Sequence, residues 1–233
     1  MKASSDCSAR LKRDRRYRSR RGIGEYDTSG GLQYTPFVSK PAVFIDRDGT
    51  LIEEAGYLNH LDRLVLFPYS VDAIRQFNRA GFLVVVITNQ AGIARGIVTE
   101  EFVETAHRHI SECLAAGGAH VDGYYHCPHH REGVRESLRR ECDCRKPRPG
   151  LLRKAAADLD IDLARSFTIG DRWHDLQAGR AAGTGALLVR TGYGRADEQA
   201  PLAGLVPDAI TDNLASAAGW ILSRAAIGSL KTP

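Results

Sequence analysis

The sequence has no apolar run long enough to cross a membrane, and it has no internal repeat. Its longest apolar run, Phe82 to Ile87, has the length of a buried strand, whereas a membrane helix needs about 20 apolar residues. The N-terminus also lacks a charged segment followed by an apolar one, which is the pattern of a secretion signal. We therefore expect a cytoplasmic protein without a membrane partner.

Net charge is also missing from most of the chain, although the formal net charge is +4. Residues 1–40 hold ten of the 32 Lys and Arg and four of the 28 Asp and Glu, so the remainder is nearly neutral. We predict that residues 1–38 form a basic, disordered arm. Such an arm can bind nucleic acid, but no nucleic-acid motif accompanies it, so we expect no such partner. A zinc-stabilised nucleic-acid-binding protein is the alternative from another functional class.

Residues 39–226 have the alternating pattern of an α/β domain, and a C-terminal tail follows at 227–233. Strands are predicted to begin near residues 42, 82, 121, 166 and 186, with helices over 70–81, 99–116, 149–159 and 174–182 and a last strand and helix within 208–225. Because strand–helix–strand units cross over right-handedly, these elements predict a doubly wound parallel sheet. Such sheets bind ligands at the carboxyl ends of their strands.

The first predicted strand ends in the motif Asp46-Arg47-Asp48-Gly49-Thr50. Two carboxylates two residues apart point roughly the same way, so they repel each other unless a cation lies between them. Mg²⁺ suits a small all-oxygen site that also holds a phosphate. A carboxylate can also attack phosphorus and form an aspartyl-phosphate. Taken alone, the motif is also compatible with an acidic turn after a strand.

Further polar residues lie near predicted strand ends or helix starts. A phosphoryl-transfer site needs a nucleophile, a cation, donors to the phosphoryl oxygens and a proton donor for the leaving oxygen. Asp46 can attack phosphorus, and Asp48 can protonate the leaving alkoxide. Thr88 and Lys146 can hold the phosphoryl oxygens, and Asp171 can complete the ligands of Mg²⁺. Each residue alone has an ordinary structural explanation, but the set predicts a phosphoryl-transfer site.

Three of the five cysteines lie in a cluster with histidines, which indicates a metal site rather than disulfide bonds. The spacing C-x-H followed by C-x-C predicts a tetrahedral Zn²⁺ site whose ligands are Cys127, His129, Cys142 and Cys144. Four protein ligands leave no open position on the metal. The site is therefore predicted to be structural.

Two neighbouring histidines, His126 and His130, compete with His129 as the nitrogen ligand. We prefer His129 because its spacing mirrors that of the C-x-C pair. Arg145 and Lys146 follow the last cysteine ligand directly. A metal that pins this cysteine would fix the backbone that aims both cations at the sheet edge.

Taken together, these motifs resemble the four motifs of the haloacid dehalogenase-like phosphatases. The matching residues are Asp46-x-Asp48-Gly49-Thr50, Thr88, Lys146 and Gly170-Asp171. The resemblance extends over about residues 41–192. It implies a Rossmann-like core with a zinc-binding loop, residues 127–144, in place of a separate cap domain.

Within this family, the stretches Thr88–Gly96, Cys127–His130 and Cys142–Pro147 resemble the branch that acts on heptose bisphosphates. This resemblance implies a Mg²⁺-dependent phosphatase that removes the 7-phosphate of a small phosphorylated sugar, a heptose 1,7-bisphosphate, in nucleotide-activated heptose biosynthesis. We expect the protein to be a monomer. The histidinol-phosphate phosphatases of histidine biosynthesis are the alternative, since they share the DxDGT motif and the C-x-H…C-x-C loop. The stretch Gly92–Gly96 favours the heptose branch.

The resemblance also implies roles for individual residues. Asp46 would be the nucleophile and Asp48 the acid/base, with Mg²⁺ on Asp46, the Asp48 backbone carbonyl and Asp171. Thr88 and Lys146 would steady the phosphoryl group. The substrate-binding residues would be Arg47, Glu54, Ala55, Gly56, Tyr57, Asn89, Gln90, Ala91, Arg145 and Arg172. Arg145 would recognise the distal phosphate, while Ala91 and Arg172 depart from the Ser and Lys common in the family.

Overall fold

The computed structural model describes residues 24–26, 32–34 and 39–229 of a chain that divides into two units, residues 1–38 and 39–233. In the first unit, β1 (Gly24–Tyr26) pairs antiparallel with β2 (Leu32–Tyr34). The sequence analysis did not predict these two short strands. The rest of the predicted basic arm lies outside the described residues.

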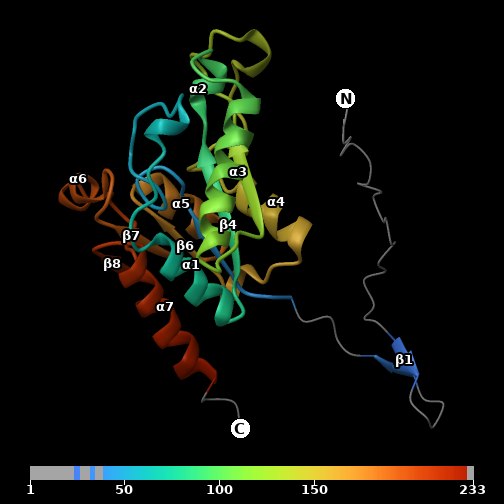
Figure 1. Cartoon of the computed structure of the whole chain (residues 1–233). Coiled ribbons are helices and arrows are strands. Elements are labelled where there is room, and N and C mark those ends of the chain that lie inside the picture. Colours follow the sequence, from blue (N-terminus) through green and yellow to red (C-terminus); the bar gives the residue numbers. More distant parts are fainter. Residues whose placement is uncertain (1–23, 27–31, 35–38, 230–233) are drawn as a thin grey trace, which may run out of the picture. The chain divides into compact units, whose positions relative to one another are not determined.

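The second unit contains one parallel sheet of six strands in the order β5-β4-β3-β6-β7-β8 (Figure 1). In chain order its strands are β3 (Ala42–Ile45), β4 (Leu83–Asn89), β5 (Gly123–Cys127), β6 (Phe167–Gly170), β7 (Gly185–Val189) and β8 (Ala209–Thr211). The chain adds β4 and β5 on one side of β3 and then returns to place β6 on the other. This reversal puts the ligand-binding position of a doubly wound sheet at the carboxyl ends of β3 and β6.

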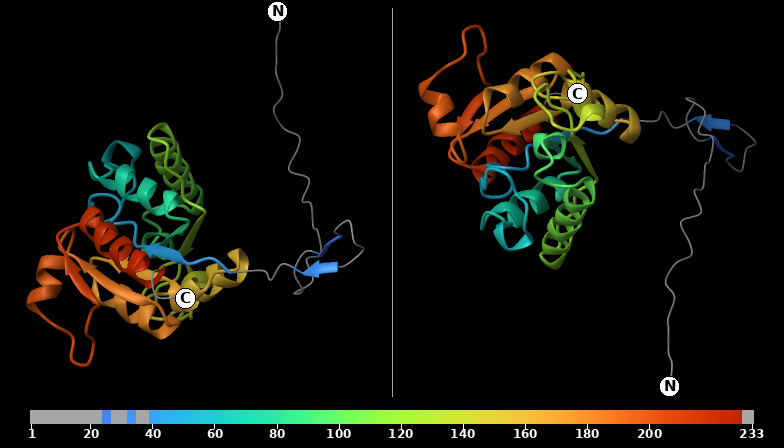
Figure 2. Two further views of the ribbon diagram at one scale, coloured as in Figure 1. Left: turned by 90° about the horizontal axis from the view of Figure 1, so that it is seen from below. Right: turned by 90° about the horizontal axis from the view of Figure 1, so that it is seen from above.

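Helices cover both faces of the sheet (Figure 2). They are α1 (Ser70–Arg79), α2 (Ala91–Ala94), α3 (Glu100–Ala116), α4 (Gly150–Leu159), α5 (Trp173–Ala182), α6 (Gly194–Gln199) and α7 (Leu214–Ser229), with 3-10 turns η1 (Leu61–Arg63), η2 (Glu136–Leu138) and η3 (Leu163–Arg165). On one face α1, α3 and α7 pack against Val43 and Ile45 of β3, and on the other α4 and α5 pack against Ala42 and Phe44. Because β3 is buried on both faces, all its residues are apolar.

The predicted doubly wound fold is confirmed, and every strand described in the second unit belongs to this sheet. Thr99 caps α3, since its Oγ1 accepts a hydrogen bond of 3.1 Å from the N–H three residues on. Some predicted boundaries are wrong. α1 ends at Arg79 rather than at residue 81, β5 begins at Gly123 rather than near residue 121, and α7 runs to Ser229, into the predicted tail. The sequence analysis also predicted neither α2 nor α6.

No helix in the described part of the chain has the length and apolar character needed to cross a membrane. The longest of these helices, α3, is amphipathic and carries a buried histidine, His107. Its ring stacks on that of Tyr124 in β5, with the ring centroids 4.5 Å apart. Burial lowers the pKa of His107 to about 3, and the positive charge of Arg47 contributes. His107 therefore stays neutral in the folded protein at pH values where the unfolded chain, with a pKa of 6.5, takes up a proton.

We predict that His107 makes the protein less stable in mild acid. The unfolded state binds the extra proton as the pH falls below 6.5, so stability contributed by neutral His107 is lost as the pH falls from 6.5 toward 3. Between pH 8 and pH 5 the wild type should lose about 2 kcal/mol more of its unfolding free energy than His107→Gln does. Urea unfolding at several pH values measures this difference.

The matched control is His109→Gln, which removes a histidine of the same helix whose side chain is 41% exposed. The pH profile of this variant shows what the loss of a more exposed histidine from the same helix does to stability. Equal pH profiles for His107→Gln and the wild type would show that His107 takes up its proton in the folded protein as well.

Candidate active site

Three carboxylates meet at the carboxyl ends of β3 and β6. Asp46 follows β3 directly, Asp171 follows β6, and Asp175 lies in the first turn of α5. Carboxylate oxygens of the three lie within 4.8 Å of one another, and the residues are 7%, 1% and 0% exposed. Parallel strands that are far apart in the sequence thus bring three buried acids together, as the sequence predicted for Asp46 and Asp171.

The ammonium group of Lys146 forms ion pairs with two acids of this cluster. Lys146 Nζ lies 2.7 Å from Asp46 Oδ1 and 2.6 Å from Asp175 Oδ1, and it donates a hydrogen bond of 3.0 Å to the Ile87 carbonyl. Burial alone would lower the pKa of Lys146, but Asp175 and Asp46 outweigh it and raise the pKa. Lys146 is therefore a permanent cation, and three carboxylates share its one charge.

Burial and the excess of negative charge raise the pKa values of two aspartates of this cluster, Asp46 and Asp171. Burial raises the pKa of Asp46 to about 6, with Lys146 opposing this shift and Asp175 and Asp48 adding to it. Burial and the charges of Asp46 and Asp175 raise the pKa of Asp171 to about 9. A group of buried oxygen ligands that lacks positive charge is the arrangement that a small divalent cation satisfies.

Asp48 has different neighbours from Asp46, although it lies only two residues away. Its carboxylate accepts hydrogen bonds from Arg47 Nε at 3.1 and 3.2 Å, from Arg47 Nη2 at 3.0 Å, from Gln90 Nε2 at 3.0 Å and from Thr88 Oγ1 at 3.3 Å. Arg47 is only 1% exposed, so the guanidinium is directed at Asp48 rather than at solvent. The two aspartates of the motif are therefore held by separate sets of donors.

Two glycines leave room for Asp171. Gly49 has a φ of +79° and Gly192 a φ of +52°, and a Cβ on either would collide with Asp171 Oδ2. That oxygen instead accepts a hydrogen bond of 2.8 Å from the Tyr193 N–H. The glycine of the DxDGT motif is thus required both by its backbone conformation and by the acid packed against it.

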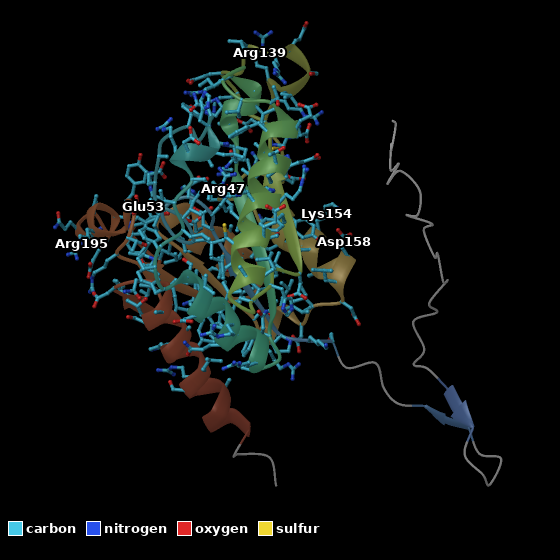
Figure 3. All side chains as sticks on the ribbon, in the orientation of Figure 1. Arg47, Glu53, Arg139, Lys154, Asp158 and Arg195 are labelled. Carbon is cyan, nitrogen blue, oxygen red and sulfur yellow. The ribbon has the colours of Figure 1, made fainter. Side chains whose placement is uncertain are left out.

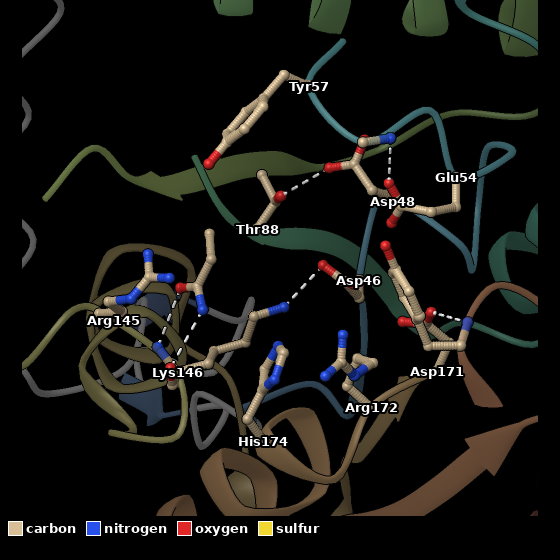
Figure 4. A pocket seen from close by; sticks show the side chains of 13 residues that line it. Asp46, Asp48, Glu54, Tyr57, Thr88, Arg145, Lys146, Asp171, Arg172 and His174 are labelled. Atoms are coloured by element: carbon tan, nitrogen blue, oxygen red, sulfur yellow. Dashed lines mark hydrogen bonds and ion pairs between the residues drawn. The ribbon is translucent and has the colours of Figure 1, made fainter. Parts of the chain in front are cut away.

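These residues border a cavity of about 360 Å³, which we call the carboxylate pocket (Figure 4). It is lined by Asp46, Asp48, Glu54, Gly56, Tyr57, Thr88, Asn89, Arg145, Lys146, Asp171, Arg172, His174 and Tyr193. The acids lie at the base of this pocket, where the strands of the sheet end. Arg145 and Arg172 add positive charge to the pocket wall. Burial, followed by the charge of Lys146, lowers the pKa of His174 to about 4, so this imidazole is neutral at neutral pH.

The four predicted zinc ligands also converge. The Sγ atoms of Cys127, Cys142 and Cys144 lie 3.2 to 3.5 Å apart, and His129 Nδ1 lies 3.3 Å from the Sγ of Cys144 and 3.8 Å from that of Cys127. Tetrahedral Zn²⁺ with Zn–S bonds of about 2.3 Å separates its sulfur ligands by about 3.8 Å, which is close to this spacing. Of the two competing histidines, His126 instead faces Glu100 at 3.2 Å, and His130 Nε2 lies 3.4 Å from Arg95 Nη2.

The loop that holds this cluster is joined to the carboxylate pocket at two places. Asn89 Nδ2 donates to the Lys146 carbonyl and Asn89 Oδ1 accepts from the Lys146 N–H, both at 3.1 Å. Arg95 Nη1 donates to the Tyr57 hydroxyl at 2.9 Å, while its Nη2 pairs with Glu132 at 3.1 Å. The first contact fixes the backbone of Lys146, and the second ties a pocket wall to the loop.

Comparison with known proteins gives the same family from sequence and from structure. The family model described as "HAD-hyrolase-like" matches residues 143–217. Over 189 residues the chain is 41% identical to D-glycero-beta-D-manno-heptose-1,7-bisphosphate 7-phosphatase of Escherichia coli (strain K12), covering 81% of this chain and 91% of that relative. The protein of the same name from Yersinia pestis is 43% identical over 155 residues, covering 66% of this chain and 82% of that relative. The chain belongs to the haloacid dehalogenase-like hydrolases.

Solved structures of this family have the same arrangement of elements. The crystal structure of D,D-heptose 1.7-bisphosphate phosphatase from B. bronchiseptica, complexed with magnesium and phosphate, has a TM-score of 0.70 and 33% identity and covers 79% of this chain and 99% of that chain. The enzyme described as D,D-heptose 1,7-bisphosphate phosphatase from Burkholderia thailandensis has a TM-score of 0.60 and 31% identity, with the same coverage of 79% and 99%.

The structure brings most of the predicted site residues of this haloacid dehalogenase-like chain to the carboxylate pocket. All the predicted catalytic residues line it, as do all but four of the predicted substrate-binding residues, the exceptions being Arg47, Ala55, Gln90 and Ala91. Arg47 and Gln90 bind Asp48 instead. Ala55 packs against the hydrophobic core, and Ala91 begins α2. The sequence motifs alone do not show whether the side chains of Arg47 and Gln90 contact the substrate or contact Asp48.

Three residues of this family site were given no role by the sequence analysis. Asp175 follows Asp171 by four residues at the start of a predicted helix, so the sequence places it at the same sheet edge, but its contact with Lys146 was not predicted. His174 is its neighbour on the first turn of α5. Tyr193 lies beyond β7, before the short helix α6, and no sequence pattern marks the turn that brings it to Asp171.

We predict that Lys146→Met destabilises the protein strongly. Methionine removes the one ammonium and leaves Asp46 and Asp175 as buried carboxylates without a counter-charge. Breaking such a buried pair typically lowers the free energy of unfolding by about 3–5 kcal/mol. Urea unfolding at neutral pH without added divalent cations measures the change.

Lys154→Met is the matched control, because Lys154 pairs with Asp158 on the surface of α4 (Figure 3). Their side chains are 63% and 42% exposed, so this loss should change the unfolding free energy by less than about 1 kcal/mol. Equal effects of the two substitutions would mean that the ion pairs of Lys146 contribute no more than exposed ones.

Proposed function

We propose that the protein removes the 7-phosphate of D-glycero-D-manno-heptose 1,7-bisphosphate, and that it depends on magnesium to do so. The observation that carries this proposal is the position of Asp46, a buried carboxylate at the base of a pocket, between the ammonium of Lys146 and the carboxylate of Asp171. The substrate is suggested by the relatives, whose names specify a heptose bisphosphate phosphatase and whose length this chain covers to 91%.

The donor set fits magnesium. Asp46 and Asp171 offer carboxylate oxygens in a buried cluster that has less positive than negative charge, and we assign the Asp48 backbone carbonyl as a further oxygen ligand. Both carboxylate oxygens of Asp175 are already engaged, Oδ1 by Lys146 and Oδ2 by the Arg172 N–H, so we assign it to these groups rather than to the metal. When bound, magnesium neutralises the phosphoryl oxygens and the carboxylates around them.

The residues then divide the reaction into two displacements. A carboxylate oxygen of Asp46 attacks phosphorus, the bond from phosphorus to the sugar oxygen breaks, and Asp48 gives its proton to the leaving alkoxide. Lys146 and Thr88 donate hydrogen bonds to the phosphoryl oxygens throughout. Asp48 next takes a proton from water, which attacks the aspartyl-phosphate and releases inorganic phosphate and restores Asp46.

The pocket wall favours a bisphosphate over histidinol phosphate. Histidinol phosphate carries a primary ammonium group away from its phosphate, whereas Arg145 adds positive charge to that part of the lining. None of the acids in the described residues pairs with Arg145. A second phosphate group would be attracted by this guanidinium, and an ammonium group would be repelled.

We expect Asp46→Asn to abolish turnover while the fold persists, because asparagine is isosteric but can neither attack phosphorus nor supply an anionic ligand. The assay measures the release of phosphate from both anomers of the heptose bisphosphate and, for comparison, from histidinol phosphate, each at saturating magnesium. Asp158→Asn, the same change on the exposed surface of α4, should keep wild-type activity (Figure 3).

Activity of Asp46→Asn within about tenfold of wild type, a difference in barrier under about 1.4 kcal/mol, would contradict its assignment as nucleophile. A higher kcat/KM of the wild type for histidinol phosphate than for either heptose anomer would contradict the substrate.

We further propose that the cluster of Cys127, His129, Cys142 and Cys144 binds a structural Zn²⁺. The four ligand atoms lie within 4.8 Å of one another, and four protein ligands leave no open position for water or phosphate. The metal would hold the backbone from which the next two residues, Arg145 and Lys146, reach the carboxylate pocket.

Cys142→Ala should therefore release zinc and loosen the loop, lowering activity by roughly 10²-fold because both cations are misplaced. Metal analysis and kinetics at saturating magnesium measure the two effects. Cys113→Ala, which removes a free thiol on α3 outside the cluster, should retain zinc and activity. Full activity of Cys142→Ala without bound zinc would refute the structural role.

A further inference from the structure

The turn that joins β7 to α6 carries two side chains to which the proposed function gives no role. Tyr193 lies in the turn itself, and Asp197 lies in α6. Tyr193 lines the carboxylate pocket and is 45% exposed. An exposed aromatic ring on the wall of a charged pocket is placed to influence the charged side chains around it.

Backbone contacts fix this turn to the active site. The Tyr193 N–H donates to Asp171 Oδ2 at 2.8 Å, and Thr191 Oγ1 donates to the Gly49 carbonyl at 2.6 Å. Tyr193 therefore cannot move away without breaking contacts to the acid after β6 and to the DxDGT turn. The position of its ring is set by the same segments that hold the acids of the pocket.

Tyr193 and Asp197 both contact Arg172, which follows Asp171 directly and lines the same pocket (Figure 4). The guanidinium carbon of Arg172 lies 4.5 Å from the centroid of the Tyr193 ring. Arg172 Nε lies 3.4 Å from Asp197 Oδ2. An aromatic face attracts a guanidinium at this distance, so a ring and a carboxylate from one segment restrain the same cation.

These contacts leave part of the guanidinium available. The Nε atom is buried and donates no hydrogen bond within the described residues, so its interaction with Asp197 is one of charge. The side chain of Arg172 as a whole is 39% exposed, and its two terminal nitrogens donate to no acceptor in the described part of the chain. They can therefore donate to the oxygens of a bound molecule.

Asp197 is itself held firmly. Its Oδ2 accepts a hydrogen bond of 2.7 Å from the Trp173 N–H, and its carbonyl accepts one of 2.8 Å from Trp173 Nε1. Trp173 begins α5, so the carboxylate lies at a helix N-terminus, where negative charge is favourable. The side chain of Asp197 is only 18% exposed, which limits the screening of its charge by solvent.

We propose that Tyr193 and Asp197 are positioning residues for Arg172, and that the guanidinium they hold binds the reacting phosphate group of the substrate. The identity of the substrate rests on the function proposed above. Three carboxylates share one ammonium at the base of the pocket, so a phosphate that approaches Asp46 needs further positive charge there. A free arginine side chain loses rotamer freedom when it binds, and restraint by the ring and the acid reduces that loss.

The test measures KM for heptose 1,7-bisphosphate at saturating magnesium in single and combined variants. Tyr193→Leu removes the ring, and Asp197→Asn removes the charge but keeps an oxygen for the Trp173 N–H. Each should raise KM about threefold with little change in kcat, since a partly exposed cation–π contact or ion pair contributes modestly. Arg172→Gln should raise KM about tenfold. Combined with Arg172→Gln, neither of the other substitutions should raise KM further, because both act through Arg172.

The matched control is Glu198→Gln, which removes the neighbouring acid of α6. Its carboxylate pairs with Arg190 at 2.7 Å rather than with Arg172, so KM should stay at the wild-type value. Tyr193→Phe keeps the ring and should raise KM less than Tyr193→Leu does. Because Asp197 also caps α5, Tyr193→Leu tests the proposal where Asp197→Asn does not fold.

The proposal would be overturned if Tyr193→Leu raised KM as much in the Arg172→Gln protein as in the wild type, since the ring would then act without Arg172. An unchanged KM in Arg172→Gln, or equal effects of Glu198→Gln and Asp197→Asn, would overturn it as well.

A wild type that does not hydrolyse the bisphosphate would instead refute the proposed function. The same variants are then compared by the Kd of inorganic phosphate at saturating magnesium, measured by calorimetry. Arg172→Gln and Tyr193→Leu should each weaken this binding, and the effect of Tyr193→Leu should vanish once Arg172 is replaced. Phosphate binding that does not change in Arg172→Gln would overturn the positioning proposal.

Discussion

The ion pairs of Lys146 are the constraint on which the active site depends. An ammonium with no exposed side-chain surface is stable only while both carboxylates stay within hydrogen-bonding distance, since removing a charge from water is costly. Its partners come from the end of β3 and the start of α5, so three separate segments must meet accurately. The reciprocal hydrogen bonds between Asn89 and the Lys146 backbone supply that accuracy from β4.

The DxDGT motif gives two adjacent aspartates different surroundings by turning the chain between them. Asp46 faces the buried acids and Lys146, while Asp48 is held by Arg47, Gln90 and Thr88 on the other side of the strand end. In the proposed mechanism one of them attacks and the other transfers protons. The two side chains have separate partners, and such a separation is what chemically equivalent groups need in order to act differently.

The sequence predicted those parts of the site that depend on local pattern. The apolar strand before Asp46, the parallel order of the strands and the C-x-H…C-x-C spacing each have a physical meaning that holds without tertiary contacts. The direction of Arg47 could not be predicted in this way, because only the fold shows that its guanidinium is buried against Asp48. The position of Tyr193 was not predicted for the same reason, since the turn after β7 contains no recognisable motif.

The distances along the chain between these parts impose an order on their assembly. Cys127 and Cys144 are 17 residues apart, whereas 100 residues separate Asp46 from Lys146. Closing the longer segment costs about 1.5 kcal/mol more in chain entropy, so the cysteine cluster forms readily before the charged site is complete. Until β6 has been synthesised, one edge of β3 has no partner strand. The nascent chain therefore presents an open edge of an entirely apolar strand, which is a template for aggregation that only the second half of the domain removes.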